Sequence, residues 1–503
     1  HQDFNFVDET RFVAFNLWCP LVDVGRSSGG LYVVPGSHTV FRTQRGPNLP
    51  KALTEYNAVL KRYGRWVNVA KGQAVIFDHC LVHHSPPNTT SEARVAVQSV
   101  LKPGEAPAVH YHFDAETSTV KAHRIDRDFI FESNLWDTSL DHLPVDHEQD
   151  LIPFPSPEAA REHLVSLRLE RSTQAAGDRP VFRDPEVQQR FSRDGFVKLD
   201  LLDDDTILEL RDLYEGKTGG RVENTDYGMY IGLESMTPAD KRAVIEAVSA
   251  AVLPRARTHF LDCKPHLGSF LVKAQGDDAY TYPHQDWTFV DAPFVSMTIW
   301  IALVDTDETN GTLGFIRGSH RFFDKPVGSP SPEFRTSTQG HEAILYEYLD
   351  FVPLRAGEAL VFDNRTIHGA APNLTRDPRI AVAIGMTPDE ARLHHYFLVP
   401  GSDPDARRRI AKLAVDAGFF ERQTIVSLKD AYLADQLPAG AEVLEIFDDE
   451  FSPYTAEEIR AFCVRSGSKR GDQRIRAPSH RPRRPIGRRL LGRVMSALQG
   501  HGR

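Results

Sequence analysis

An internal repeat constrains the fold of this chain more than any other feature of its sequence. The segment HQDFNFVDETRFVAFNLWCPLVDVGRSSGGLYVVPGSH at 1–38 matches HQDWTFVDAPFVSMTIWIALVDTDETNGTLGFIRGSH at 284–320, with one residue of insertion. A second pair of segments, 67–97 and 352–382, aligns without a gap. Self-similarity of this kind predicts two tandem copies of one structural module.

The repeat divides the 503 residues into four parts. We expect a first copy at 1–170, a polar linker at 171–184, a second copy at 185–465 and a basic tail at 466–503. The second copy has a long segment ahead of its HQD sequence that the first copy lacks. We therefore interpret the first copy as truncated at its N-terminus, and the chain as a fragment.

Short runs rich in Val, Ile, Phe and Thr alternate with Gly, Pro, Asn and Asp turns from residue 268 onward. This pattern predicts a mainly β fold, a jelly roll or sandwich, with flanking helices rather than a parallel sheet. Helical spacing predicts helices at 184–196, 204–215, 239–252 and 404–417.

Composition narrows the functional classes. From Arg465 onward the chain has twelve Lys and Arg residues and one acidic residue, so this end carries a charge of +11. Because the net charge of the whole chain is −10, the rest of the chain carries −21. An acidic body argues against a nucleic-acid enzyme. No run is long and apolar enough for a transmembrane helix. The tail is predicted to be disordered, with contact to acidic lipid or a partner as the alternative. Four scattered cysteines fit a reducing compartment, and we expect a cytoplasmic protein.

Four chemical groups recur in the same order in the two copies. They are His284, Asp286, His368 and Arg379 in the second copy, and His1, Asp3, His83 and Arg94 in the first. In a strand, residues i and i+2 point to the same side, so the HQD sequence offers an imidazole and a carboxylate to one centre. A distant imidazole completes a facial triad, which leaves three positions open on an iron(II) ion. A 2-oxo acid and oxygen would occupy them.

The recurring arginine has a separate predicted role. A guanidinium can donate two parallel hydrogen bonds to the far carboxylate of 2-oxoglutarate. A lysine would bind that carboxylate less specifically. Trp300 follows the HQD sequence closely enough to form a wall of the same pocket. A surface ion pair is the ordinary alternative for such an arginine.

Most other histidines have a simpler interpretation. His38 and His320, in the two G-S-H sequences, are interpreted as structural turn residues, and His110 and His395 as core or pocket-lining residues. His79 and His84 correspond to Asn364 and Gly369 in the second copy, so we interpret them as incidental.

At these residues the chain resembles the phytanoyl-CoA dioxygenase family. RFSRDGFVKLDLLDDDTILELRDLYE resembles the opening segment of the family, YPHQD its metal strand, IRGSH its P-G-S-H turn, and HGAAPNLTRDPRIAVAI the segment with the last ligand and the cosubstrate arginine. The resemblance implies a double-stranded β-helix core of the cupin type. It also implies iron(II), 2-oxoglutarate and oxygen as cofactors, and hydroxylation of a small organic or acyl substrate.

Carried over residue by residue, the resemblance implies a site in each copy. The metal ligands become His284, Asp286 and His368, with Arg379, Trp300 and Gln285 at the cosubstrate. In the first copy the metal ligands become His1, Asp3 and His83, with Arg94, Trp18 and Gln2 at the cosubstrate.

Some alternatives stay open at this point. A binding or regulatory role for degenerate copies would be signalled by loss of the Asp or the Arg, and both copies keep both. A cupin-like metal enzyme that does not use 2-oxoglutarate has no need of the Arg379 spacing. A halogenase is disfavoured, because it typically replaces the Asp of the triad. One departure from the family is Arg317, where the family and the first copy (Pro35) have proline.

Overall fold

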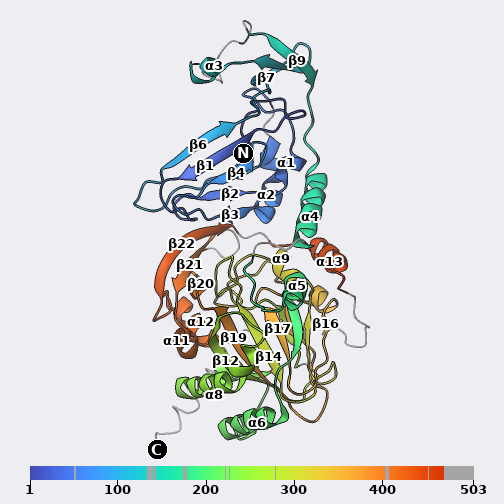
Figure 1. The fold of residues 1–503 in the computed structure, drawn as a ribbon, viewed down its shortest axis with the longest axis vertical. Helices are drawn as coiled ribbons and strands as arrows, with labels where there is room; N and C mark the ends of the chain where they lie inside the picture. The colour runs from blue at the N-terminus through green and yellow to red at the C-terminus, as the bar shows by residue number, and fades with distance from the viewer. Residues whose placement is uncertain are drawn as a thin grey trace, which may run out of the picture.

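A computed structural model describes two parts of the chain, which Figure 1 shows stacked along the long axis. The described residues are 1–49, 52–132, 140, 143–173, 178–220, 222–225, 227–277, 279–402, 407–450 and 453–468. We call residues 1–173 the N-terminal part and residues 178–468 the C-terminal part. Both are built mainly from antiparallel sheets with helices around them, as the sequence predicts.

Two facing sheets form the centre of the C-terminal part. One has six strands in the order β10-β17-β14-β19-β12-β11, and the other has four in the order β13-β18-β15-β16. A cluster of buried residues that includes Trp300, Phe315 and Phe362 fills the space between them. The strands are β10 (Phe196–Asp200), β11 (Tyr230–Ile231), β12 (Cys263–Lys273), β13 (Thr281–His284), β14 (Met297–Ala302), β15 (Leu313–Phe315), β16 (Asp350–Phe351), β17 (Glu358–Asp363), β18 (His368–Ala370) and β19 (Arg379–Pro388).

Three of the four predicted helices are confirmed. They are α5 (Pro185–Asp194), α6 (Asp204–Thr218) and α8 (Pro238–Ala256). Each begins at an N-cap whose side chain accepts backbone N–H groups: Asp184, Asp203 and Thr237. Valines four residues apart on α8 pack against the outer face of the six-stranded sheet, so this sheet is buried on both faces.

Short helices complete the C-terminal part. They are α7 (Gly232–Ser235), α9 (Ser319–Phe322), α10 (Glu342–Tyr346), α11 (Ala417–Arg422), α12 (Ile425–Leu433) and α13 (Ala456–Arg465).

The N-terminal part repeats the strand pairing of the C-terminal part. Its sheets have the orders β4-β1-β6, β3-β2-β5 and β7-β8-β9, and their counterparts are β17-β14-β19, β16-β15-β18 and β20-β21-β22. The strands are β1 (Phe15–Pro20), β2 (Leu31–Val33), β3 (Arg65–Val67), β4 (Val75–Asp78), β5 (His83–His84), β6 (Ala96–Leu101), β7 (Val109–Asp114), β8 (Thr119–Arg124) and β9 (Val145–Asp150). The helices are α1 (Ser37–Val40), the 3-10 helix η1 (Ala52–Tyr56), α2 (Asn57–Tyr63), α3 (Arg127–Glu132) and α4 (Pro157–Thr173).

Burial differs sharply between equivalent strands. Val382 on β19 is completely buried, whereas Val97 at the equivalent position of β6 is 53% exposed. The difference arises because β19 pairs with β12 on its far side and lies under α8. Among the described residues, β6 pairs with β1 alone.

The helix predicted at 404–417 is wrong. Residues Arg407–Ala414 form strand β21, between β20 (His394–Leu398) and β22 (Glu442–Glu450). The Arg, Ala, Lys and Leu residues of this segment favour a helix locally, but pairing with two neighbours and burial of Ile410 and Leu413 outweigh that preference.

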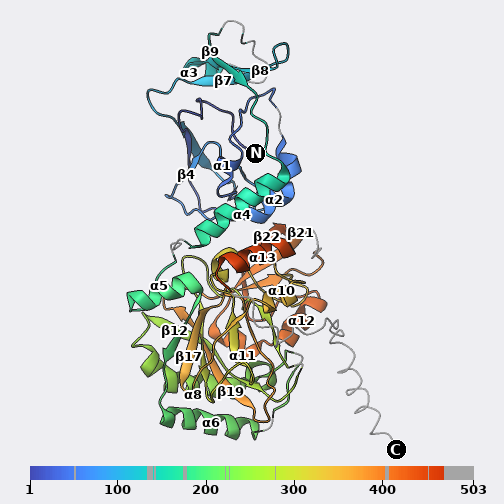
Figure 2. The same cartoon turned by 90° about the vertical axis from the view of Figure 1, so that its right-hand side faces the viewer.

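The two parts share one apolar core. Figure 2 shows α4 running from the N-terminal part towards α13. One continuous cluster includes Phe41 and Leu164 from the N-terminal part with Phe322 and Phe462 from the C-terminal part. At the edge of this core, Arg62 Nη1 lies 2.9 Å from the buried Glu458 carboxylate. The two parts therefore pack as neighbours over an extended apolar interface.

The described residues include no helix with the length and apolar composition needed to cross a membrane. Most of the predicted basic tail, residues 469–503, lies outside the described residues.

Candidate metal centre

Three side chains predicted as ligands converge in the C-terminal part. His284 lies at the end of β13 and pairs with His368 at the start of β18. The Asp286 Oδ1 atom lies 3.8 Å from Nε2 of each histidine. The candidate ligand atoms of all three residues lie within 4.8 Å of one another. That spacing fits three ligands around one metal ion.

Backbone carbonyls fix the tautomers of both histidines. His284 Nδ1 lies 2.8 Å from the Tyr282 carbonyl oxygen, and His368 Nδ1 lies 3.0 Å from that of Thr366. A carbonyl only accepts, so each Nδ1 carries a proton, and in the neutral form of either ring the lone pair lies on Nε2. Burial, followed by the neighbouring His284, lowers the pKa of His368 to about 4. His368 is therefore neutral at pH 7, as a metal ligand must be.

Two side chains orient the carboxylate of Asp286. The Asn364 amide donates to Asp286 Oδ2 over 2.8 Å, and the Thr298 hydroxyl lies 3.5 Å from the same oxygen. Oδ1 is thereby left to face the histidines. Asn364 was not predicted from the sequence, although its position next to the strand that precedes His368 was a usable signal.

The predicted cosubstrate arginine is buried at the start of β19, on the six-stranded sheet that faces β13 and β18. Arg379 is 1% exposed, and its guanidinium carbon lies 5.0 Å from the centroid of the Trp300 ring. Its Nη1 donates to the Leu271 carbonyl oxygen over 3.0 Å, whereas Nε has no partner. Within the described parts of the chain no carboxylate pairs with it. Burial alone lowers its pKa to about 9, so the cation is held there at a cost in free energy.

The two glutamines of the HQD sequences point away from the metal ligands. The Gln285 amide donates to the carbonyl oxygens of Phe323 and Arg365. Gln2 donates in the same way to the carbonyls of Phe41 and Cys80. Residues i and i+1 of an extended chain face opposite sides, which explains the difference. Through these hydrogen bonds the two glutamines brace the backbone beside the triads.

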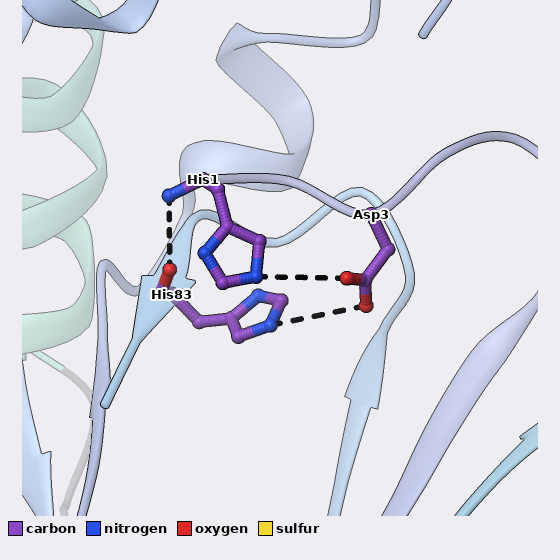
Figure 3. A group of neighbouring side chains, drawn as sticks. All are labelled: His1, Asp3 and His83. Carbon is purple, nitrogen blue, oxygen red and sulfur yellow. Dashed lines mark hydrogen bonds and ion pairs between the residues drawn. The ribbon is translucent and has the colours of Figure 1, made fainter. Parts of the chain in front are cut away.

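A second triad lies in the N-terminal part, at the residues equivalent to the first in the repeat, and Figure 3 shows its three side chains gathered together. His1 Nε2 lies 3.6 Å from Asp3 Oδ1, and His83 Nε2 lies 3.8 Å from Asp3 Oδ2. His83 Nδ1 donates to the Leu81 carbonyl oxygen over 2.9 Å, which again leaves Nε2 free. This triad therefore has the same donor set and the same tautomer at its distal histidine.

The surroundings of this second triad differ in two positions. Asn16 takes the place of Thr298 and donates to Asp3 Oδ2 over 2.8 Å. His79 takes the place of Asn364; it is 1% exposed, and its Nε2 lies 3.7 Å from the same oxygen. The interpretation of His79 as incidental is therefore wrong, since it borders the carboxylate of the triad.

The N-terminal part has the same arginine–tryptophan pair, Arg94 and Trp18, but its arginine is more exposed to solvent than Arg379. The guanidinium carbon of Arg94 lies 5.5 Å from the centroid of the Trp18 ring. Trp18 is buried, but Arg94 is only partly buried because β6 is exposed along much of its length.

Three other histidines that the sequence singled out, His320, His395 and His110, are buried. His320 is buried, and its Nε2 lies 3.2 Å from the Ser192 carbonyl oxygen, which agrees with a role in the turn. His395 is buried beside Trp287, and the Ser329 hydroxyl lies 2.7 Å from its Nε2. His110 is buried in the N-terminal part.

Fold and site together define a β protein with a candidate mononuclear centre of two histidines and one carboxylate. The family model described as phytanoyl-CoA dioxygenase matches residues 1–96 and 233–381, which contain the two triads. Over these two segments the chain matches the phytanoyl-CoA dioxygenase family.

Named relatives are similar over part of their length. An ectoine dioxygenase of Nocardia farcinica is 32% identical over 121 residues, which cover 22% of this chain and 41% of the relative. Phytanoyl-CoA dioxygenase 1 of Oryza sativa subsp. japonica is 31% identical over 121 residues, 23% of this chain and 41% of the relative. The chain thus spans less than half the length of these relatives.

Solved structures give weaker matches. The α-ketoglutarate-dependent carbocyclase SnoK from nogalamycin biosynthesis is 20% identical with a TM-score of 0.33, over 42% of this chain and 86% of that one. HygX from Streptomyces hygroscopicus, with nickel and 2-oxoglutarate bound, is 16% identical with a TM-score of 0.30, over 41% of this chain and 88% of that one.

Proposed function

We propose that this chain is an iron(II)- and 2-oxoglutarate-dependent dioxygenase. In this proposal His284, Asp286 and His368 hold the iron, and Arg379 binds the far carboxylate of 2-oxoglutarate. The observation that carries it is the pairing of a facial donor set with a buried guanidinium that has no carboxylate partner among the described residues. An uncompensated buried cation is costly unless a ligand brings the opposite charge.

The donor set fits ferrous iron better than other common metals. Two imidazoles and one carboxylate with open positions are typical of non-haem iron(II) oxygenases, whereas structural zinc sites are closed by four protein ligands. When bound, iron and 2-oxoglutarate supply oxidising power from molecular oxygen, with release of succinate and carbon dioxide. The contribution of the protein is to fix the ligand tautomers through Tyr282 and Thr366 and to orient Asp286 through Asn364.

We further propose that the chain is a tandem duplication of a jelly-roll module, with copies at 1–170 and 185–465 joined at 171–184. The matching strand pairing and the two triads support this division. His1, Asp3 and His83 would then form a second iron site, with Arg94 and Trp18 beside its cosubstrate. The relatives are named for substrates as different as ectoine and phytanoyl-CoA, so we infer a small-molecule substrate without naming it.

Succinate formation from 2-oxoglutarate tests this function. Iron-loaded protein is incubated aerobically with 2-oxoglutarate, with and without a panel of small metabolites. Asp286→Ala should abolish succinate formation at the C-terminal triad. Asp3→Ala, the matched variant of the other triad, should leave succinate formation at the C-terminal triad unchanged.

Each alternative has a distinct outcome. Absence of succinate from the unaltered protein, together with absence of affinity for 2-oxoglutarate, would favour a binding role or a metal enzyme independent of that acid. Full succinate production by Asp286→Ala and none by Asp3→Ala would move the activity to the N-terminal triad.

A further inference from the structure

A second buried cation lies directly opposite Arg379. Lys273, the last residue of β12, is the cross-strand partner of Arg379 on β19. Directly opposed residues of an antiparallel pair point to the same face. Lys273 is 0% exposed and Arg379 is 1% exposed. Two positive side chains are therefore enclosed side by side at one end of the space between the sheets.

Neutral oxygens alone surround the ammonium group of Lys273. Its Nζ donates to the Gly228 carbonyl over 3.0 Å, to the Thr281 hydroxyl over 3.1 Å and to the carbonyl of Ala279. In the described ranges no carboxylate pairs with either Lys273 or Arg379. Burial, and then the charge of Arg379, hold the pKa of Lys273 well below its ordinary value. A negative ligand between the two cations would relieve both effects.

The local backbone makes room for this lysine. Gly311 has a φ of +98°, and a Cβ atom at this position would lie 2.7 Å from Lys273 Cδ. A side chain there would strain the turn and displace the lysine stem. The equivalent glycine of the N-terminal part, Gly29, also has a positive φ and lies beside Arg94. The path of the Lys273 side chain is thus determined by its surroundings.

We propose that Lys273 is a positioning residue of the oxo-acid pocket, where it supplies the second positive charge that, with Arg379, selects an acid with a second carboxylate. This inference rests on the proposed function. It adds that the pocket discriminates 2-oxoglutarate from monocarboxylic 2-oxo acids through two cations rather than one.

A purely structural role is the competing explanation, because Lys273 also joins the loops that contain Gly228 and Ala279. The two roles predict different ligand selectivity. A structural tie would affect every 2-oxo acid alike, whereas a second charge affects only an acid with a distal carboxylate.

Anaerobic calorimetry of the full chain loaded with iron(II) separates them. The probes are 2-oxoglutarate and 2-oxovalerate, which has the same chain length and a methyl group in place of the distal carboxylate. Lys273→Gln keeps N–H groups for the carbonyls but removes the charge, and Lys273→Arg keeps the charge. Lys264→Gln is the matched control, since Lys264 lies on the same strand and donates to the Asp389 carbonyl at an exposed position.

We expect Lys273→Gln to weaken 2-oxoglutarate binding about 10-fold or more and to leave 2-oxovalerate binding unchanged. Lys273→Arg should retain most of the selectivity, and Lys264→Gln all of it. Equal weakening of both acids, or of neither, by Lys273→Gln would overturn the inference while the proposed function stands. If Lys273→Gln fails to fold, loss of selectivity in folded Lys273→Arg overturns it. Failure of the unaltered, iron-loaded protein to bind 2-oxoglutarate would overturn both proposals.

Discussion

Arg379→Met is expected to separate the cosubstrate role of this arginine from its structural role. Methionine fills a similar volume beside Trp300 but carries neither charge nor donors. Breaking a buried charge pair by removing one partner costs about 3–5 kcal/mol. At about 1.4 kcal/mol per tenfold change, 2-oxoglutarate affinity should fall roughly a hundred-fold to several thousand-fold.

Without 2-oxoglutarate, the free energy of unfolding of the same variant should change little or should increase. Lowering of the Arg379 pKa from 12.5 to about 9 corresponds to roughly 4–5 kcal/mol against the charged form. The cation–π contact with Trp300 and the hydrogen bond to Leu271 offset part of that cost. We therefore expect the cosubstrate-free variant to melt at the same temperature as the unaltered protein or higher.

Two measurements check this prediction. Anaerobic calorimetry gives the 2-oxoglutarate affinity, and thermal melts with and without 2-oxoglutarate give the ligand-induced stabilisation. Arg94→Met, the matched variant in the N-terminal part, should leave the affinity of the C-terminal site unchanged. Unchanged 2-oxoglutarate affinity in a folded Arg379→Met protein would refute the assignment of the pocket.

Three further predictions concern packing, the metal and pH. Val382→Ala should lower the free energy of unfolding by about 2–3 kcal/mol, because it removes buried methyl groups and leaves a cavity. Val97→Ala, at the equivalent exposed position, should change it by about 0.5 kcal/mol or less in urea titrations, and equal effects would contradict the burial difference. Asn364→Ala should weaken metal binding roughly 10- to 100-fold in a competitive chelator titration, since it frees the carboxylate ligand to rotate; an unchanged affinity would exclude this role. Burial lowers the pKa of His320 to about 4 and that of His395 to about 3. Because these folded-state values lie below the unfolded value of 6.5, the unfolded chain takes up protons first. Stability should therefore fall as the pH decreases from 6.5 towards 4, by up to about 1.4 kcal/mol per pH unit for each histidine. Urea titrations at several pH values should give a shallower slope for His320→Gln, and an identical slope would argue against this burial effect.

The main architecture is predictable from the sequence because its signals are local or repeated. Capping residues such as Asp184 and Asp203 mark helix starts within a few residues of the helices themselves. The repeat of the HQD sequence and of the distal histidine is sufficient to predict both triads. The local sequence of strand β21 predicts a helix, whereas its conformation is decided by its partners β20 and β22, which lie elsewhere in the sequence.

The residues that sequence reasoning missed act through non-local contacts. Asn364, His79 and Lys273 belong to residue types that occur on any protein surface. The fold brings Asn364 and His79 to the ligand carboxylates, and strand pairing brings Lys273 opposite Arg379. The apolar core that joins Phe41 to Phe322 depends on how the two parts pack, which no periodicity in the sequence records.

Anomalous diffraction at the iron absorption edge tests the central claim most directly. Crystals grown without oxygen and loaded with iron(II) and 2-oxoglutarate should give a strong peak among His284 Nε2, His368 Nε2 and Asp286 Oδ1. Density for the oxo acid should extend from that peak to the guanidinium of Arg379. Iron bound elsewhere, or a C-terminal triad without a peak in fully loaded crystals, would contradict the account.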